Sequence, residues 1–184
     1  ASWGPFLLPR DKMISKTTRQ LRPIAIGSFH LKKTRSATIG PSSLSMVSPS
    51  QADLDIIAGW ALDELSRFHW AGNSLPVGSG GEVLAERAVR LGSKQLAFVQ
   101  APGHVPVGYL ELASIDLLNR SLLLQHMIVG PPSLRNKGLG REAIQLATAF
   151  AFSEIGVDRV ELLVAETNRS AISCYLSVGY SIEG

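Results

Sequence analysis

The sequence predicts a mixed α+β domain in which helices pack on the faces of one sheet. Three strand-like runs separated by turn residues follow one another between residues 95 and 129, which is typical of an antiparallel meander. Between residues 140 and 178 the pattern changes to helix, strand, helix. A chain of 184 residues has room for one such domain with a tail.

The residues before the meander are expected to form one short strand and two helices. Ser45 to Val47 is interpreted as the strand. Ser50 with Asp53 three residues later is typical of a helix start, and apolar residues recur after it at helical spacing: Leu54, Ile57, Ala58, Ala61 and Leu65. A second helix is expected over residues 82–91, after a turn-rich segment from Trp70 to Gly81.

From residue 95 onward the expected elements follow at short intervals. The strands of the meander are Gln95 to Gln100, Val107 to Ile115 and Leu122 to Val129. After them we expect an amphipathic helix over residues 140–155, a β-branched strand over 160–165, a helix over 169–178 and a strand beginning at Tyr180.

Charge divides the chain near residue 43. Residues 1–43 hold eight Lys and Arg residues and one acidic residue. Residues 44–184 hold ten Lys and Arg residues and fourteen Asp and Glu residues. The basic segment shows no sustained period, so an organelle-targeting leader and a disordered arm both fit, as does a leader of no function upstream of a true start at Met46. Its cations are scattered and not interleaved with aromatics, which makes nucleic-acid binding the weaker interpretation. We therefore assign residues 1–43 to an arm and residues 44–184 to the domain.

Composition excludes several classes of protein. A hydrophobic fraction of 45% excludes a wholly disordered chain. The single cysteine, Cys174, excludes an internal disulfide and fits a reducing compartment, so we expect a cytoplasmic protein, or an organellar one if the basic segment is a leader. No apolar run approaches the roughly 18 residues of a membrane span, and no metal site is predicted.

The most informative stretch runs from Val129 to Arg141. An apolar strand ends there, a loop with Gly138 and Gly140 follows, and a helix begins. The first turn of a helix presents unpaired backbone N–H groups and the positive end of its dipole, and glycines permit close approach, so the stretch favours a phosphate-bearing ligand. Three cations, Arg135, Lys137 and Arg141, can offset its charge. Neither the spacing of a Walker A loop nor a dinucleotide fingerprint is present.

Two ordered motifs resemble the GNAT acetyltransferases. Arg135-x-x-Gly138-x-Gly140 after an apolar strand is similar to the acetyl-CoA pyrophosphate loop of that family, and residues 168–180 are similar to its second motif, with Asn, Ala, an aromatic and a Gly-aromatic pair. The resemblance is specific over residues 122–183 and looser over residues 46–121. It leans toward the branch that includes ribosomal-protein N-terminal and polyamine acetyltransferases.

The resemblance implies a mixed, mostly antiparallel sheet with a V-shaped splay, flanked by helices. In the family a further strand follows the position of Tyr180, whereas this sequence stops at Gly184. We therefore expect an incomplete C-terminal strand, completed by a partner or by a continuation of the chain. An open sheet edge of this kind predicts a homodimer.

The resemblance also implies transfer of an acetyl group from acetyl-CoA, as co-substrate, to a primary amine of a small molecule or a protein N-terminus. The amine attacks the thioester directly. The backbone of Met127, Ile128 and Val129 would pair with the pantetheine arm, and the remaining cofactor-binding residues would be Arg135, Asn136, Lys137, Gly138, Leu139, Gly140, Arg141 and Asn168. The acidic body favours a cationic acceptor, for which Trp60, Phe68 and Trp70 would form a groove wall or belong only to the core.

The catalytic assignment is Tyr175 as the acid and Glu111 as the base. Tyr175 matches the usual acid of the family, and its alternative role is a packed aromatic on the helix. Gln125 stands where many relatives carry a glutamate, which leaves Glu111, His126 or a water chain as the base. A solvated sheet face is the alternative role of Glu111. The substitution at Gln125 also permits a degenerate domain that binds acyl-CoA as a sensor or scaffold.

Overall fold

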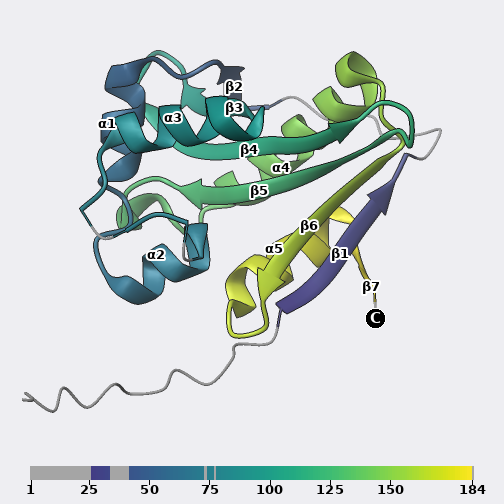
Figure 1. The fold of residues 1–184 in the computed structure, drawn as a ribbon. Helices are drawn as coiled ribbons and strands as arrows, with labels where there is room; N and C mark the ends of the chain where they lie inside the picture. Colours follow the sequence, from purple (N-terminus) through teal and green to yellow (C-terminus); the bar gives the residue numbers. More distant parts are fainter. Residues whose placement is uncertain (1–25, 34–41, 73, 77, 184) are drawn as a thin grey trace, which may run out of the picture.

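The computed structural model contains one seven-stranded sheet with the strand order β2-β3-β4-β5-β6-β1-β7 (Figure 1). Neighbouring strands are antiparallel except β5 and β6, which are parallel. This is the mixed, mostly antiparallel sheet that the sequence predicts. The structure describes residues 26–33, 42–72, 74–76 and 78–183, and the expectations for residues 1–25 and 34–41 lie outside this part.

The strands are β1 (Ile26–Lys32), β2 (Leu44–Val47), β3 (Lys94–Gln100), β4 (Pro106–Asp116), β5 (Ser121–Val129), β6 (Arg159–Ala165) and β7 (Ser181–Glu183). The helices are α1 (Gln51–Ala58), α2 (Glu64–Ala71), α3 (Gly81–Leu91), α4 (Leu139–Phe150) and α5 (Arg169–Val178), and α4 continues as a π-helical turn, Ala151–Ile155. None of the described helices is long and apolar enough to cross a membrane.

The first helical segment is divided in two. The Ser50–Asp53 capping box predicted from the sequence starts α1, but the apolar spacing that predicted one helix as far as Leu65 is interrupted. The chain leaves α1 at Gly59, and the carboxylate of Asp63 starts α2 by accepting from the Ser66 N–H at 2.8 Å. The second cap explains why one periodic stretch yields two helices.

The basic N-terminal segment contributes a strand to the sheet. The expectation that residues 1–43 form an arm outside the domain is wrong for residues 26–33. There β1 pairs with β6 at seven positions and with β7 at three, antiparallel in both cases. Lys33 continues the attachment, since its N–H donates to the Asp158 carbonyl at 2.8 Å and its Nζ to the Phe152 carbonyl at 3.0 Å. A segment of the chain itself thus lies between β6 and β7 in the sheet.

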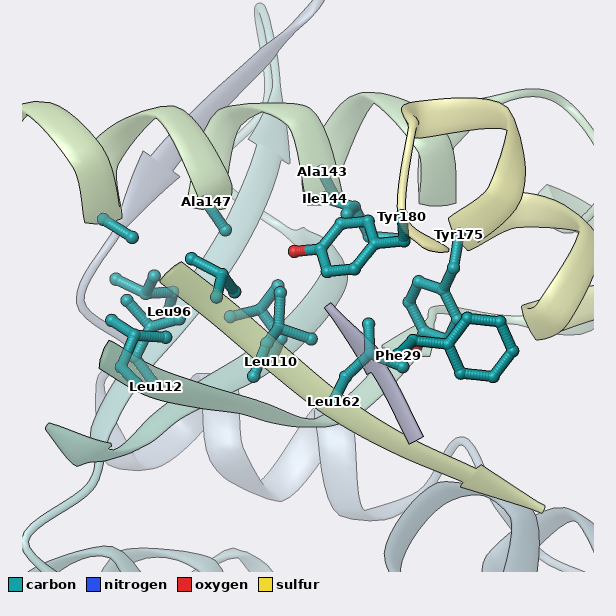
Figure 2. Close-up of a cluster of buried hydrophobic side chains, with 14 of the residues drawn as sticks. Phe29, Leu96, Leu110, Leu112, Ala143, Ile144, Ala147, Leu162, Tyr175 and Tyr180 are labelled. Carbon is teal, nitrogen blue, oxygen red and sulfur yellow. The ribbon is translucent and has the colours of Figure 1, made fainter. Parts of the chain in front are cut away.

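Two apolar cores lie on opposite faces of the sheet. One joins the sheet to α4 and α5, and Figure 2 shows its central side chains, with Ile144 of α4 above Leu110 of β4 and Leu162 of β6. The other joins the sheet to α1, α2 and α3 around Tyr109 and Trp70. Each large side chain that is fully buried in this way contributes about 1.5–3 kcal/mol. The sheet therefore separates α2 from α4 and α5.

Candidate active site

Strands β5 and β6 are paired at one end only. Their parallel register runs from Ser121 beside Arg159 to Leu124 beside Leu162 and stops there. In Figure 1 the two strands diverge from this common end. Beyond it lies a cavity of about 640 Å³ that is lined on the strand side by residues 124–129 of β5 and by Leu163 and Val164 of β6. This divergence is the V-shaped splay that the resemblance implied.

A β-bulge in β5 lies where the splay begins. Its register with β4 shifts so that two residues, His126 and Met127, lie opposite Leu110 alone. His126 has a φ of 54°, a left-handed conformation that is uncommon outside glycine. Its carbonyl accepts a hydrogen bond from Trp70 Nε1 at 2.7 Å, so α2 holds the bulge in place. Bulges bend a strand and redirect its side chains, and His126, in this bulge, is among the residues that line the cavity.

The loop after β5 carries a row of unpaired backbone N–H groups. Of the seven amides from Arg135 to Arg141, that of Arg135 donates to the Pro132 carbonyl at 3.1 Å, and the other six have no acceptor among the described residues. Positive φ angles of 59° at Asn136 and 85° at Gly138 turn the chain into α4. The last three of these amides form the first turn of α4 at the positive end of its dipole. Such a row suits a phosphate or diphosphate.

Gly140 allows α4 to begin close to the end of β5. A Cβ at this position would lie 3.3 Å from Cγ2 of Val129 and 3.7 Å from Sγ of Cys174. All three residues line the cavity. A larger side chain at position 140 would therefore intrude on the space next to the unpaired amides.

The three predicted cations of the loop occupy different environments. The guanidinium of Arg135 donates to the Trp60 carbonyl at 3.2 Å, so it fastens the loop to the segment between α1 and α2. Arg141 lines the cavity. Two of the predicted cofactor-binding residues lie outside the lining: Lys137, which is exposed, and Leu139, which is buried in the core.

Helix α5 and the residue that caps its N-terminus supply Tyr175 and Asn168 to the cavity lining. Asn168 Oδ1 caps the helix by accepting from the Ala171 N–H at 3.3 Å. The Tyr175 ring packs between Phe29 and Tyr180, at centroid distances of 6.3 and 5.9 Å. Burial, together with the neighbouring Tyr180, raises the pKa of Tyr175 well above its ordinary value. Tyr175 is therefore a packed aromatic and, at the same time, a neutral phenol beside the cavity.

Glu111 does not lie on a solvated face. It is fully buried, forms an ion pair with Arg87 of α3 and accepts a hydrogen bond from Tyr109 Oη at 2.6 Å. Burial alone would raise its pKa, but the hydrogen bonds from His126 and Tyr109 and the charge of Arg87 outweigh it and lower the pKa of Glu111 to about 2. Glu111 is not among the residues that line the cavity, so its contact with the cavity runs through another group.

His126 connects this buried pair to the cavity. Its Nδ1 lies 3.3 Å from Glu111 Oε2, and its Nε2 lies 3.3 Å from Arg87 Nη1 and 3.4 Å from the hydroxyl of the exposed Ser74. Because a guanidinium can only donate, these contacts assign the hydrogen of the neutral imidazole to Nδ1. A chain of polar groups therefore runs from the cavity to the surface at Ser74.

Helix α2 closes the cavity on the other face of the sheet. Ser66, His69 and Trp70 line it, and His69 Nε2 lies 3.1 Å from the Thr167 hydroxyl in the segment between β6 and α5. Of these residues the sequence marked only Trp70, as a groove wall or core residue. Ser66 and His69 carry no local signal, because their place in the site depends on how α2 packs against the bulge of β5.

The chain is similar to known acetyltransferases. A family model described as "Acetyltransferase (GNAT) family" matches residues 64–180. Spermidine N(1)-acetyltransferases from Escherichia coli K12 and O157:H7 are each 32% identical over 77 residues, which are 42% of this chain and 40% of the relative. The match thus spans less than half of the length of these curated relatives.

Solved structures with a similar fold include a spermidine N-acetyltransferase from Vibrio cholerae in complex with CoA and spermine. Its TM-score is 0.65 at 22% identity, over 77% of this chain and 83% of that one. A dodecameric structure of the same enzyme in an intermediate state has a TM-score of 0.58 at 23% identity, over 77% and 81% of the two chains. At these identities the likeness concerns the fold.

Proposed function

The chain belongs to the acetyltransferase (GNAT) family, and from this premise we propose that it transfers an acetyl group from acetyl-CoA to a primary amine. The proposal rests above all on the six N–H groups from Asn136 to Arg141, which have no acceptor in the part of the chain that the structure describes and lie next to the cavity between β5 and β6. A diphosphate matches that row in charge and in hydrogen bonding. The splay offers the attached arm a passage toward α2, on the other face of the sheet.

The residues around the cavity fit acetyl-CoA along its length. Its diphosphate would accept from the loop amides, and Arg141 would offset part of its charge. Its pantetheine arm would lie along Met127 to Val129, where β5 has lost β6 as a partner, and would pair with the strand edge as an added strand does. A backbone N–H on this edge would polarise the thioester carbonyl.

Acetyl transfer requires two proton movements. The nitrogen lone pair of the amine forms the new C–N bond, the C–S bond breaks, and its electron pair leaves with sulfur. The nitrogen must lose a proton and the sulfur must gain one.

We assign the proton from nitrogen to the imidazole of His126, which is among the residues that line the cavity. Uptake at Nε2 requires that this atom give up the hydrogen bond from Arg87 Nη1, 3.3 Å away. Glu111 acts through His126 as a positioning residue: its carboxylate faces Nδ1 and stabilises the imidazolium that forms. The exposed hydroxyl of Ser74, 3.4 Å from Nε2, offers the proton a path to solvent. This arrangement compensates for the amide of Gln125, which cannot accept a proton.

We assign the proton for sulfur to Tyr175. A phenol is protonated at neutral pH, and burial raises the pKa of this one further, so Tyr175 would hold a proton that it can pass to a departing thiolate. The phenol lines the cavity from α5, on the face of the sheet that carries the loop amides. The proposed acid and base thus come from two different elements, α5 and β5.

The proposal is tested by acetyl-CoA binding and amine-dependent release of free thiol. Saturation with acetyl-CoA at about 100 times its Kd should stabilise the fold by about 2.7 kcal/mol and raise its Tm by several degrees. Thiol release should then depend on the added amine. Binding without such release would contradict acetyl transfer, and the absence of binding would contradict the role of the loop amides.

We also propose a homodimer that pairs through β7. This strand is last in the order of the described strands, and its three residues are exposed, so its outer edge, which pairs with none of the described residues, would be offered to a second copy. Sedimentation of the chain as a monomer at micromolar concentration would contradict this proposal.

A further inference from the structure

The lining of the cavity contains no carboxylate among the described residues. Fourteen of the fifteen Asp and Glu residues of the chain fall in the part that the structure describes, so the acids are known and lie elsewhere. The side chains of the lining that are cationic or can become so are Arg135, Arg141, His69 and His126, and its other titratable groups are the Cys174 thiol and the Tyr175 phenol. The carboxylate of Glu111, in contact with His126, is already neutralised by Arg87.

The acceptor end of the cavity is the end that α2 closes. Leu162 and Val164 belong to the core beneath α4 and α5, so Leu163, between them on the strand, points to the face of α2. Leu163 is 60% exposed and lines the cavity. An amine entering from this side meets its aliphatic side chain together with the indole of Trp70, the imidazole of His69 and the hydroxyl of Ser66.

We propose that the acceptor is an amine whose reacting nitrogen is its only cationic centre and whose remainder is apolar. This inference rests on the proposed function. A second ammonium group would lose its hydration on entering the cavity and would find no carboxylate there to pair with. It would also be repelled by the two arginines of the lining. The acidic body had favoured a cationic acceptor, but its acids lie outside the cavity. The curated relatives are spermidine acetyltransferases. In contrast, we expect this chain to acetylate polyamines inefficiently.

Pentylamine and 1,5-diaminopentane provide a matched test, since they differ only in the second ammonium group. With purified full-length chain and saturating acetyl-CoA, kcat/KM for pentylamine should exceed that for the diamine, and that for spermidine, by about tenfold or more. Equal or better use of either polyamine would overturn the inference while leaving acetyl transfer intact. Absence of transfer to every amine would refute the proposed function, and the inference with it.

A carboxylate introduced at the acceptor end should change this preference. Leu163→Glu is expected to raise the ratio of diamine to monoamine turnover by about threefold, the range for a partly exposed ion pair. Leu163→Gln, nearly identical in shape and uncharged, should leave the ratio unchanged. Because Leu163 is exposed, both variants should fold, which their melting curves would verify. If Leu163→Glu and Leu163→Gln changed the ratio equally, the inference would be overturned. The preference for monoamines would then not result from the lack of a carboxylate in the cavity.

Discussion

The ring of Phe29 lies 6.3 Å from the ring of Tyr175, tilted by 48°, and joins the N-terminal strand to the helix that lines the cavity (Figure 2). Phe29 is 2% exposed and Tyr175 7%. The two residues are 146 positions apart in the sequence. The segment that composition alone assigned to an arm therefore supports the side chain proposed as the catalytic acid.

Replacing Phe29 by alanine should destabilise the whole domain. Loss of a fully buried phenylalanine costs about 3–5 kcal/mol, because the cavity left behind is only partly refilled. The same change frees one side of the Tyr175 ring, so kcat should fall as well. Urea unfolding measures the first effect. Leu118→Ala, at a residue 91% exposed, is the control and should change stability by less than about 0.5 kcal/mol; a similar loss in both variants would contradict the packing argument.

Two truncated chains distinguish the role of residues 1–25 from that of β1. A chain that begins at residue 26 retains β1 and should bind acetyl-CoA, whereas a chain that begins at Met46 loses β1 and the first two residues of β2. The second chain should lose cooperative unfolding and acetyl-CoA binding, since β1 pairs with β6 at seven positions, and β6 forms one wall of the cavity. Thermal melting and calorimetric titration measure the two effects. Full stability and binding in the chain that starts at Met46 would show that β1 is dispensable.

Gly140→Val should weaken acetyl-CoA binding. Its Cβ would already lie 3.3 Å from Val129, and its methyl groups would enter the space beside the unpaired amides. We expect Kd to rise about tenfold or more, which corresponds to about 1.4 kcal/mol. Gln145→Val introduces the same β-branched residue elsewhere on α4 and serves as the control for helix propensity. Equal Kd values for the two variants would show that the loop is not the binding site.

His126→Gln should lower kcat about a hundredfold or more, the usual range for loss of a general base. The amide keeps a polar group near Glu111 but cannot accept the proton from the amine. The Kd for acetyl-CoA should stay within about twofold, since the diphosphate site lies on the loop. His69→Gln, at the other cavity histidine, is the matched control. A larger loss of kcat in that control would indicate that His69 of α2, and not His126 of β5, is the general base.

The buried Glu111 should make stability depend on acid pH. Its pKa in the folded chain, about 2, is lower than its ordinary value of 4.5, so the ionised carboxylate stabilises the fold. This contribution, about 3 kcal/mol, is complete above pH 4.5 and is lost as the pH falls toward 2. Urea unfolding between pH 2 and 7 would show it as a slope.

Glu111→Gln should flatten that slope and should destabilise the domain at pH 7, because it leaves the Arg87 guanidinium buried and unpaired. Glu64→Gln, at an exposed acid of α2, is the control and should keep the slope. An unchanged slope in the Glu111 variant would assign the acid sensitivity to other carboxylates.

The sequence by itself determined the local features. The Ser50–Asp53 box starts α1, Asn168 caps α5, and Gly156 and Gly179 end helical segments in left-handed conformations. The change from strand to loop to helix between β5 and α4 was predicted in the same way, and Gly138 precedes the first residue of α4. Each of these features depends on residues within one or two helical turns, so local spacing was sufficient to predict them.

Only the tertiary structure decided where β1, Glu111 and His126 lie. The partner of β1 is β6, which begins 127 residues after β1 ends. Glu111 is buried because α3 places Arg87 over it, and His126 enters the cavity because α2 holds a bulge in β5. No local pattern contains this information. The pairing of distant segments depends on which arrangement of the whole chain buries the most apolar surface while leaving the fewest polar groups unpaired.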